Sequence, residues 1–174
     1  MKMGVRKAAV LVLVLLALQS AGAFAQGRVE GPSARNNVYL ELLGNGFVYS
    51  LNYERFLGRR FSLRVGGMVL TGTGESEDGQ TATALLTIVP VMLNRLVNLG
   101  GRHNLEVGAG LDLAYLNVKS DLVGKLSGSG VGFTARFGYT YFNPDGGFNF
   151  RIAYTPIWSE EFSHSFGIGL GYAF

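Results

Sequence analysis

The residues that could supply a nucleophile and its base meet at one place in the sequence, Ser163-His164-Ser165. A hydroxyl nucleophile needs a base within hydrogen-bond reach. The surrounding residues alternate as in a strand, and neighbouring strand residues point to opposite faces, so His164 shares a face with neither serine. The other histidine, His103, follows Arg102 at an expected turn and is interpreted as a solvated residue. We therefore assign no catalytic residues.

Two other motifs imitate ligand sites. The segment 72–79 carries Glu75, Glu77 and Asp78, but it lacks the full spacing of a calcium-binding loop. Alternate glycines at 167, 169 and 171 resemble a nucleotide fingerprint, yet they alternate along a strand and open no helix. The sequence has no cysteine, which excludes thiolate metal sites and disulfides. We predict no metal and no cofactor.

The elements that must position any site are strands. Apolar residues alternate with other residues with a period of two, in segments of about ten residues that glycine, asparagine or charged clusters interrupt. The pattern predicts eight strands near residues 37–43, 47–56, 61–70, 81–96, 104–117, 131–142, 148–158 and 163–174. Pro90 lacks a backbone donor, so the register and facing of its strand stay open.

The composition of the two strand faces indicates the solvent. In residues 131–141 one face is Val, Phe, Ala, Phe, Tyr and Tyr, and the other is Gly, Thr, Arg, Gly and Thr. A water-soluble barrel would carry lysine and glutamate on its outer face. Small residues suit the narrow interior of a small closed barrel, and a continuous apolar face suits lipid. The sequence therefore predicts an all-β fold, an eight-stranded antiparallel up-and-down transmembrane β-barrel.

Seven charged residues fall on the face that would line the lumen. Burying an unpaired charge costs several kcal/mol, so we expect salt bridges that fill the interior as a structural plug. A gated path for small ions is the alternative. The predicted lumen charge network consists of four acids and three arginines: Glu41, Glu54, Arg64, Glu106, Asp112, Arg136 and Arg151.

The first 25 residues are typical of a secretory signal peptide. They combine Lys2, Arg6 and Lys7, an apolar run over 8–18, and the cleavage motif Ala23-Phe24-Ala25. Removing these three basic residues from 15 leaves 12, equal to the 12 acidic residues. No cationic surplus remains, so a nucleic-acid partner is excluded. Residues 26–36 are expected to be a flexible lead-in, and 37–174 the barrel domain.

The spacing of the turns predicts an orientation. With both termini in the periplasm, short turns fall inside, and the longer connections 71–80 and 118–130 fall outside as loops. Their roles stay open. The acidic loop is expected to contact lipopolysaccharide through divalent ions.

The end of the chain carries apolar residues at every second position: Phe166, Ile168, Leu170, Tyr172 and Phe174. With the segment 49–56, this pattern resembles the small outer-membrane β-barrels of Gram-negative bacteria, of the OmpX and OmpA transmembrane-domain kind, over residues 37–174. The resemblance implies that the terminal residues are a signal for the barrel-assembly machinery. It also implies a monomer in the cell outer membrane, with lipid and lipopolysaccharide as partners.

The predicted function is a structural, envelope-stabilising or surface-interaction role without catalysis. A narrow porin-like channel is one alternative. Some barrels of this kind modify lipid A through histidine and serine, so a lipid-modifying enzyme is the other alternative. The arrangement around His164 departs from the histidine-x-serine pattern of the deacylases.

Overall fold

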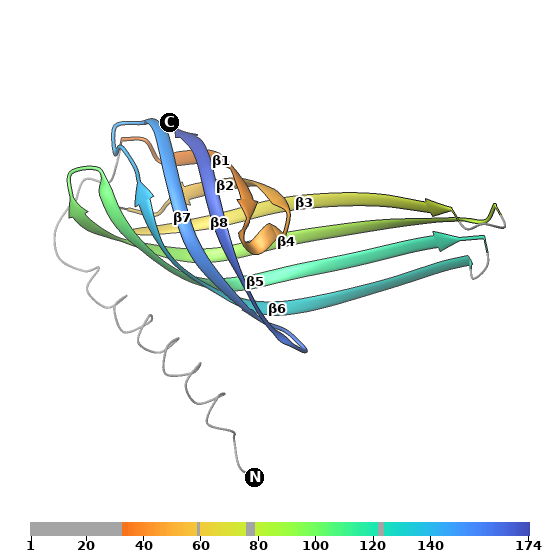
Figure 1. Ribbon diagram of the computed structural model, residues 1–174. Helices are drawn as coiled ribbons and strands as arrows, with labels where there is room; N and C mark the ends of the chain where they lie inside the picture. The colour runs from red at the N-terminus through yellow and green to blue at the C-terminus, as the bar shows by residue number, and fades with distance from the viewer. Residues whose placement is uncertain (1–32, 59, 76–78, 122–123) are drawn as a thin grey trace, which may run out of the picture. The chain divides into compact units, whose positions relative to one another are not determined.

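The computed structural model describes residues 33–58, 60–75, 79–121 and 124–174. The predicted signal peptide and residues 26–32 of the lead-in lie outside this range. The described chain forms one barrel (Figure 1). Its elements are β1 (Asn36–Leu43), the 3-10 turn η2 (Gly44–Gly46), β2 (Tyr49–Phe56), β3 (Phe61–Glu75), β4 (Thr81–Gly100), β5 (His103–Ser120), β6 (Gly124–Tyr141), β7 (Gly147–Trp158) and β8 (Phe162–Ala173).

Each strand pairs antiparallel with its neighbours in sequence, and β1 pairs with β8 to close the barrel. Leu40 of β1 lies opposite Leu51 on one side and Leu170 on the other. The seam ends where Asn36 and Phe174 exchange backbone hydrogen bonds of 2.9 and 2.8 Å. Closure pairs the backbone groups of the edge strands, which a sheet in hydrocarbon requires. The predicted fold class is confirmed.

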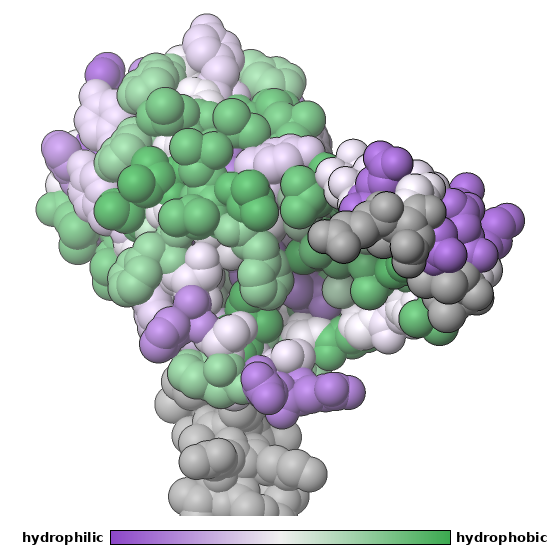
Figure 2. Space-filling view, turned by 45° about the vertical axis from the view of Figure 1, so that its right-hand side comes forward, coloured by the Kyte–Doolittle hydropathy of each residue, from purple (hydrophilic) through white to green (hydrophobic). Residues whose placement is uncertain are grey.

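The strand faces are inside-out relative to a soluble barrel. Large apolar side chains such as Phe133 (62% exposed) and Phe137 (45% exposed) point outward. Glutamates, arginines and asparagines are buried within. Figure 2 shows hydrophobic residues spread over the barrel wall. This transmembrane arrangement follows from the two-residue period, because alternate side chains enter opposite solvents.

Four strands extend beyond their predicted bounds, and only β3 and β6 do so extensively at the end where the predicted loops lie. β3 to β6 have 15, 20, 18 and 18 residues, whereas β1 and β2 have 8 each, and β7 and β8 have 12 each. The expectation of loops over 71–80 and 118–130 is wrong, because β3 runs to Glu75, β5 runs to Ser120, and β6 starts at Gly124. The two long hairpins run past the other strands as a projecting sheet (Figure 1). We call this end of the barrel the hairpin end, and the opposite end the termini end.

In the projecting sheet the inward face becomes apolar and the outward face becomes polar, the reverse of the barrel wall. On β5 the inward positions change from Glu106 and Asp112 to Leu116 and Val118, while the outward positions change from leucines to Asn117 and Lys119. The adjacent strands repeat the change, which leaves an inner apolar stripe of residues in register: Leu70, Leu86, Leu116, Val118 and Leu126. Figure 2 shows hydrophilic residues gathered at the tip of this sheet. The reversal explains why the predicted strands 61–70 and 131–142 stop short of this sheet, whereas the predicted strands 81–96 and 104–117 already enter it.

Pro90 lies inside the barrel, in register with Asp112 of β5. On its other side the ladder with β3 is interrupted between the pairs Val65–Val91 and Met68–Ile88. A Cβ at Gly66 would approach the Pro90 ring to 2.9 Å. The missing donor of Pro90 therefore falls in a gap of the ladder, and the glycine opposite makes room for its ring.

An apolar cluster closes the termini end. It consists of Ala34, Phe56, Leu96, Phe142 and Ala173, with the Phe56 and Phe142 rings 4.5 Å apart between centroids. Ala34 donates its backbone N–H to Pro144 at 3.0 Å. The last residues of the predicted lead-in are thus tied to the β6–β7 turn.

Across the described ranges, no helix has the length and apolar character needed to cross a membrane.

Candidate functional site

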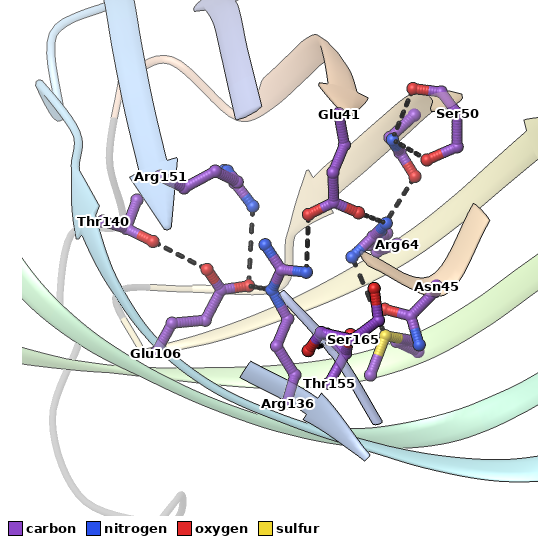
Figure 3. A network of polar contacts seen from close by, with 12 residues as sticks. Glu41, Asn45, Ser50, Arg64, Glu106, Arg136, Thr140, Arg151, Thr155 and Ser165 are labelled. Atoms are coloured by element: carbon purple, nitrogen blue, oxygen red, sulfur yellow. Dashed lines mark hydrogen bonds and ion pairs between the residues drawn. The ribbon is translucent and has the colours of Figure 1, made fainter. Parts of the chain in front are cut away.

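The barrel interior holds a chain of six alternating charges from six different strands. In order they are Arg64 (β3), Glu41 (β1), Arg136 (β6), Glu106 (β5), Arg151 (β7) and Glu54 (β2). Five ion pairs link them, as Figure 3 shows for most of the chain. We call this set the ion-pair chain.

The links are short and fully desolvated. Arg64 Nη2 lies 2.5 Å from Glu41 Oε2, and Arg136 Nη1 lies 2.7 Å from Glu41 Oε1. Arg136 Nε lies 3.1 Å from Glu106 Oε1, and Arg151 joins Glu54 at 2.7 Å and Glu106 at 3.5 Å. All six side chains are 0 or 1% exposed. Three carboxylates therefore balance three guanidinium groups in a dry interior.

Hydroxyl and amide groups satisfy the remaining carboxylate oxygens. Thr140 donates to Glu106 Oε2 at 2.6 Å, and Ser62 donates to Glu54 Oε1 at 2.5 Å. Asn37 Nδ2 donates to Glu54 Oε2 at 3.1 Å. These bonds fix the carboxylates, since a buried charge needs hydrogen bonds as well as a counterion.

β4 and β8 contribute no charged residue to the ion-pair chain. The small residues of β8 instead leave room for it. The inward positions of β8 are the alternate glycines, where an added Cβ would lie 2.8 Å from Glu41 Oε1 at Gly167 and 2.7 Å from Arg151 Cγ at Gly169. The glycine motif noted in the sequence thus makes room for the ion-pair chain.

Asp112 is the one predicted network residue that the ion-pair chain leaves out. It is 5% exposed, and Asn45 Nδ2 donates to its Oδ2 at 3.3 Å. Asn45 belongs to the turn η2, which folds inward. Asn45 Nδ2 also donates to Thr134 Oγ1 at 2.5 Å. Leu43 and Phe47, on either side of this turn, have positive φ values of 60° and 63°, so the backbone turns sharply into the lumen. The turn therefore covers the lumen at the hairpin end.

Tyr39 is an interior residue that the sequence argument did not single out. It is 1% exposed, and the guanidinium carbons of Arg151 and Arg64 lie 3.9 and 5.3 Å from its ring centroid. Its signal was its position two residues before Glu41 on the same strand face. Interior asparagines such as Asn45 and Asn52 were also missed, because an amide carries no sign of its facing.

The histidines lie outside the interior. His164 packs between Tyr154 and Phe162 on the outward face, with ring centroids 6.3 and 6.0 Å away. Ser163 and Ser165 occupy the alternate positions of β8. His103 Nδ1 lies 2.6 Å from the Tyr139 hydroxyl near the termini end. Neither histidine lies beside a serine on its own face.

The predicted assembly-signal residues all lie on the outward face of β8 and at the chain end. Phe166, Ile168, Leu170, Tyr172 and Phe174 are 62, 46, 52, 62 and 58% exposed. Their role in assembly stays a prediction.

The charged groups of the ion-pair chain are paired and buried. Every charge of the ion-pair chain is neutralised by a neighbour and shielded from solvent. Within the described part of the chain, no three His, Asp or Glu residues are grouped to hold a metal ion.

Comparisons with known proteins show where this geometry recurs. No protein-family model and no curated protein matches the chain. Among solved structures, Ail, the attachment invasion locus protein of Yersinia pestis, matches with a TM-score of 0.51 at 15% identity, over 83% of this chain and 99% of Ail. Its complex with the heparin analogue sucrose octasulfate matches with a TM-score of 0.52 at 14% identity, over 80 and 95% of the two chains.

The N-terminal β-barrel domain of Pseudomonas aeruginosa OprF matches with a TM-score of 0.47 at 18% identity, over 80% of this chain and 95% of that domain. Ail and the OprF domain are both eight-stranded outer-membrane barrels. The likeness to Ail, together with the closed and inside-out barrel, shows that this chain has the fold of the small eight-stranded outer-membrane β-barrels.

Proposed function

We propose that the protein is an integral outer-membrane barrel with a sealed lumen, a structural or surface-interaction role and no catalytic activity. The observation that carries this proposal is the ion-pair chain, which crosses the interior from six strands. An eight-stranded barrel has an interior just wide enough for its own side chains. Sealing the lumen keeps the envelope impermeable at the site of the protein.

Two further features support the sealed state over a narrow channel. The turn η2 covers the hairpin end, and the apolar cluster around Phe56 and Phe142 closes the termini end. A conducting pathway would have to displace both and to separate charges that are 0 or 1% exposed. Breaking such a pair costs about 3–5 kcal/mol.

We place the hairpin end outside the cell and the termini end in the periplasm. The two long hairpins at one end and the short turns at the other support this orientation. The outward apolar wall would contact lipid and lipopolysaccharide, and the apolar residues of β8 would be recognised by the barrel-assembly machinery.

The projecting sheet is the surface on which an external partner would bind. Over residues 71–80 and 116–130 the sequence has four acidic residues, Glu75, Glu77, Asp78 and Asp121, and two basic residues, Lys119 and Lys125, an acidic balance. Sucrose octasulfate, which is bound in one of the Ail structures, is a polyanion. The acidic balance here does not support a sulfated sugar as the partner of this chain.

Conductance tests the sealed lumen. Purified monomer in a planar bilayer is expected to give no stable current, whereas Arg136→Ala, which breaks two links of the ion-pair chain, is expected to give brief ion-conducting openings. Phe137→Leu on the outward face is the matched control and should stay silent. Large ohmic currents from the unmodified monomer would overturn the sealed barrel and favour the channel.

Orientation is tested by labelling, since the chain has no cysteine of its own. Lys119→Cys lies on the projecting sheet and Arg102→Cys in a turn at the termini end, and both side chains are exposed. In intact cells a membrane-impermeant maleimide should label Lys119→Cys and leave Arg102→Cys unlabelled until the outer membrane is opened. The reverse labelling pattern would contradict the proposed orientation. If neither variant were labelled after the outer membrane is opened, the proposed location in this membrane would be wrong.

A further inference from the structure

The hairpin end holds a half-open cavity of about 420 Å³ at the foot of the projecting sheet. Its walls come from the inner face of β4 to β6, through Ile88, Ala114 and Gly130, and from Phe47 and Ile157 on the opposite side. The inner apolar stripe continues from these walls along the projecting sheet. Cavities with apolar walls and a few polar groups are the usual form of small-molecule sites.

A carboxylate without a cationic partner lines this cavity. Asp112 is 95% buried, being 5% exposed, and its Oδ1 has no hydrogen-bond donor among the described residues. The neighbouring Asn45 is fully buried, and its Oδ1 also has no donor. Asn45 Nδ2 donates to the other oxygen of Asp112, so Asp112 Oδ1 is a buried, charged acceptor without a donor among the described residues. Leaving such groups unpaired costs about 1–3 kcal/mol each, and more for a charge.

The charge balance of the interior points the same way. Among the described residues, its buried charged side chains are four acids and three arginines. The three arginines are committed to Glu41, Glu54 and Glu106 in five ion pairs. Asp112 forms none of these pairs, so the interior carries one uncompensated negative charge next to the cavity. Glu160 at the rim of the cavity adds a second acid rather than a counterion.

We propose that this cavity binds a small aliphatic ammonium ion, with the ammonium group on Asp112 and the aliphatic body against the apolar walls. A primary ammonium has three donors and no acceptor, which suits the donor-free Oδ1 of Asp112. It also supplies the missing positive charge, and charge-assisted hydrogen bonds are the stronger kind. A carboxylate ligand would meet Asp112 and Glu160 as like charges, and a neutral alcohol would leave Asp112 without a counterion.

Glycines keep the cavity open, which gives a variant that closes it. An added Cβ at Gly130 has no atom within 4 Å, and the same holds at Gly128, two residues along the same face of β6. Of these two glycines, Gly130 lines the cavity and Gly128 does not. Gly130→Val is therefore expected to fill the site without a clash, and Gly128→Val is its matched control.

The experiment is a nuclear magnetic resonance titration of the full-length mature barrel in zwitterionic lipid nanodiscs at neutral pH. Hexylamine is the probe, with hexanol and hexanoate as controls of equal chain length. We expect hexylamine alone to shift the amide signals of Ala114, Gly130 and Gly132 in a saturable manner. Asp112→Asn and Gly130→Val should each weaken its affinity at least tenfold, and Gly128→Val should leave it within twofold.

Several results would overturn the proposal. These are equal binding of hexanol, hexylamine affinity that Asp112→Asn leaves unchanged, or shifts confined to lipid-facing amides such as that of Phe137. Saturation of the same amides by sodium or calcium without hexylamine would assign the site to an inorganic cation instead. If Asp112→Asn fails to fold, Gly130→Val against Gly128→Val still decides whether the probe occupies this cavity.

Discussion

The guanidinium carbon of Arg151 lies 3.9 Å from the centroid of the Tyr39 ring, while its two terminal nitrogens reach Glu54 and Glu106. The ring approaches the cation on its face, and the carboxylates approach it through its terminal nitrogens. Arg64 lies 5.3 Å from the same ring. The ring of Tyr39 therefore contacts both arginines, and its electron-rich face offsets part of their positive charge.

Two substitutions separate the ring of Tyr39 from its hydroxyl. The hydroxyl oxygen is buried without a hydrogen-bond partner. Tyr39→Phe keeps the ring and removes the unsatisfied group, so stability should stay unchanged or rise by about 1 kcal/mol. Tyr39→Leu removes the cation–π contact and should cost about 2 kcal/mol. Urea unfolding in lipid vesicles measures both, and a Tyr39→Phe variant as unstable as Tyr39→Leu would contradict this interpretation.

Arg136 and Phe137 are neighbours in sequence with opposite surroundings. Arg136→Ala leaves Glu41 Oε1 and Glu106 Oε1 without their shared partner and should cost about 3–5 kcal/mol. Phe137 is 45% exposed on the outward wall. Phe137→Leu should be nearly neutral, whereas Phe137→Arg near the bilayer midplane should cost about 2–4 kcal/mol.

The same urea unfolding assay in vesicles tests this contrast. Indifference to Phe137→Arg, or equal losses for Arg136→Ala and Phe137→Leu, would show that the assigned faces are wrong.

Two glycines should differ sharply in their tolerance of alanine. A Cβ at Gly171 would overlap the Val38 carbonyl oxygen and the Tyr39 backbone across the β1–β8 seam, whereas a Cβ at Gly67 meets no atom within 4 Å. Gly171→Ala should cost about 1–3 kcal/mol by overpacking. Gly67→Ala should be neutral or stabilise by about 0.4–1 kcal/mol, because alanine restricts the unfolded chain.

The fraction of folded barrel after refolding, read from its faster migration on unheated electrophoresis gels, distinguishes the two glycine variants. Equal folded fractions would show that the seam is not closely packed.

At the hairpin end, the hydrogen bonds between Asp121 and Thr81 should link the ends of β4 and β5 in a pH-dependent manner. The Thr81 backbone N–H and hydroxyl donate to Asp121 Oδ2 at 2.9 and 2.8 Å, and they hold the pKa of this carboxyl below its ordinary value. A lowered folded-state pKa means that the contact is fully present above the unfolded-state pKa and is lost as pH falls through the folded-state pKa.

The Thr81 amide signal, followed by nuclear magnetic resonance, should therefore change only in strongly acidic solution. Asp121→Asn is the control and should abolish that transition. A midpoint at or above the ordinary aspartate pKa would contradict the bond.

The fold could be predicted because apolar residues alternate with small or polar residues along most of the membrane strands, and this alternation indicates which side chains face lipid and which face the lumen. Residues 131–141 alternate without exception, and β6 follows that alternation. The parts of the projecting sheet formed by β3 and β6 were not predicted, because residues such as Gly72, Thr73 and Ser127 carry no lipid-facing signal. In water the outward face no longer needs apolar groups, so a strand there has the composition of a loop.

The site could be predicted only in part for a related reason. Alternation assigns a residue to the interior, but pairing depends on register and strand tilt across the lumen, which local sequence does not state. Arg136 contacts Glu41 from β1 as well as Glu106 from the adjacent strand β5. Asp112 accepts a hydrogen bond from Asn45 of the turn η2 and forms none of the five ion pairs. That inward turn depends on the positive φ angles of Leu43 and Phe47, and no sequence motif predicted them.

The ion-pair chain also bears on the order in which the barrel folds. The linked residues Glu54 and Arg151 are 97 positions apart, and Glu41 is linked to Arg136 on β6. An intermediate that lacked β6 and β7 would hold Glu41, Glu54 and Glu106 in the membrane with only Arg64 to neutralise them. Contacts this distant form only after the entropy of loop closure has been overcome. We therefore expect half-built barrels to be high in free energy in lipid, so that wall closure and charge neutralisation occur together as one cooperative, rate-limiting event.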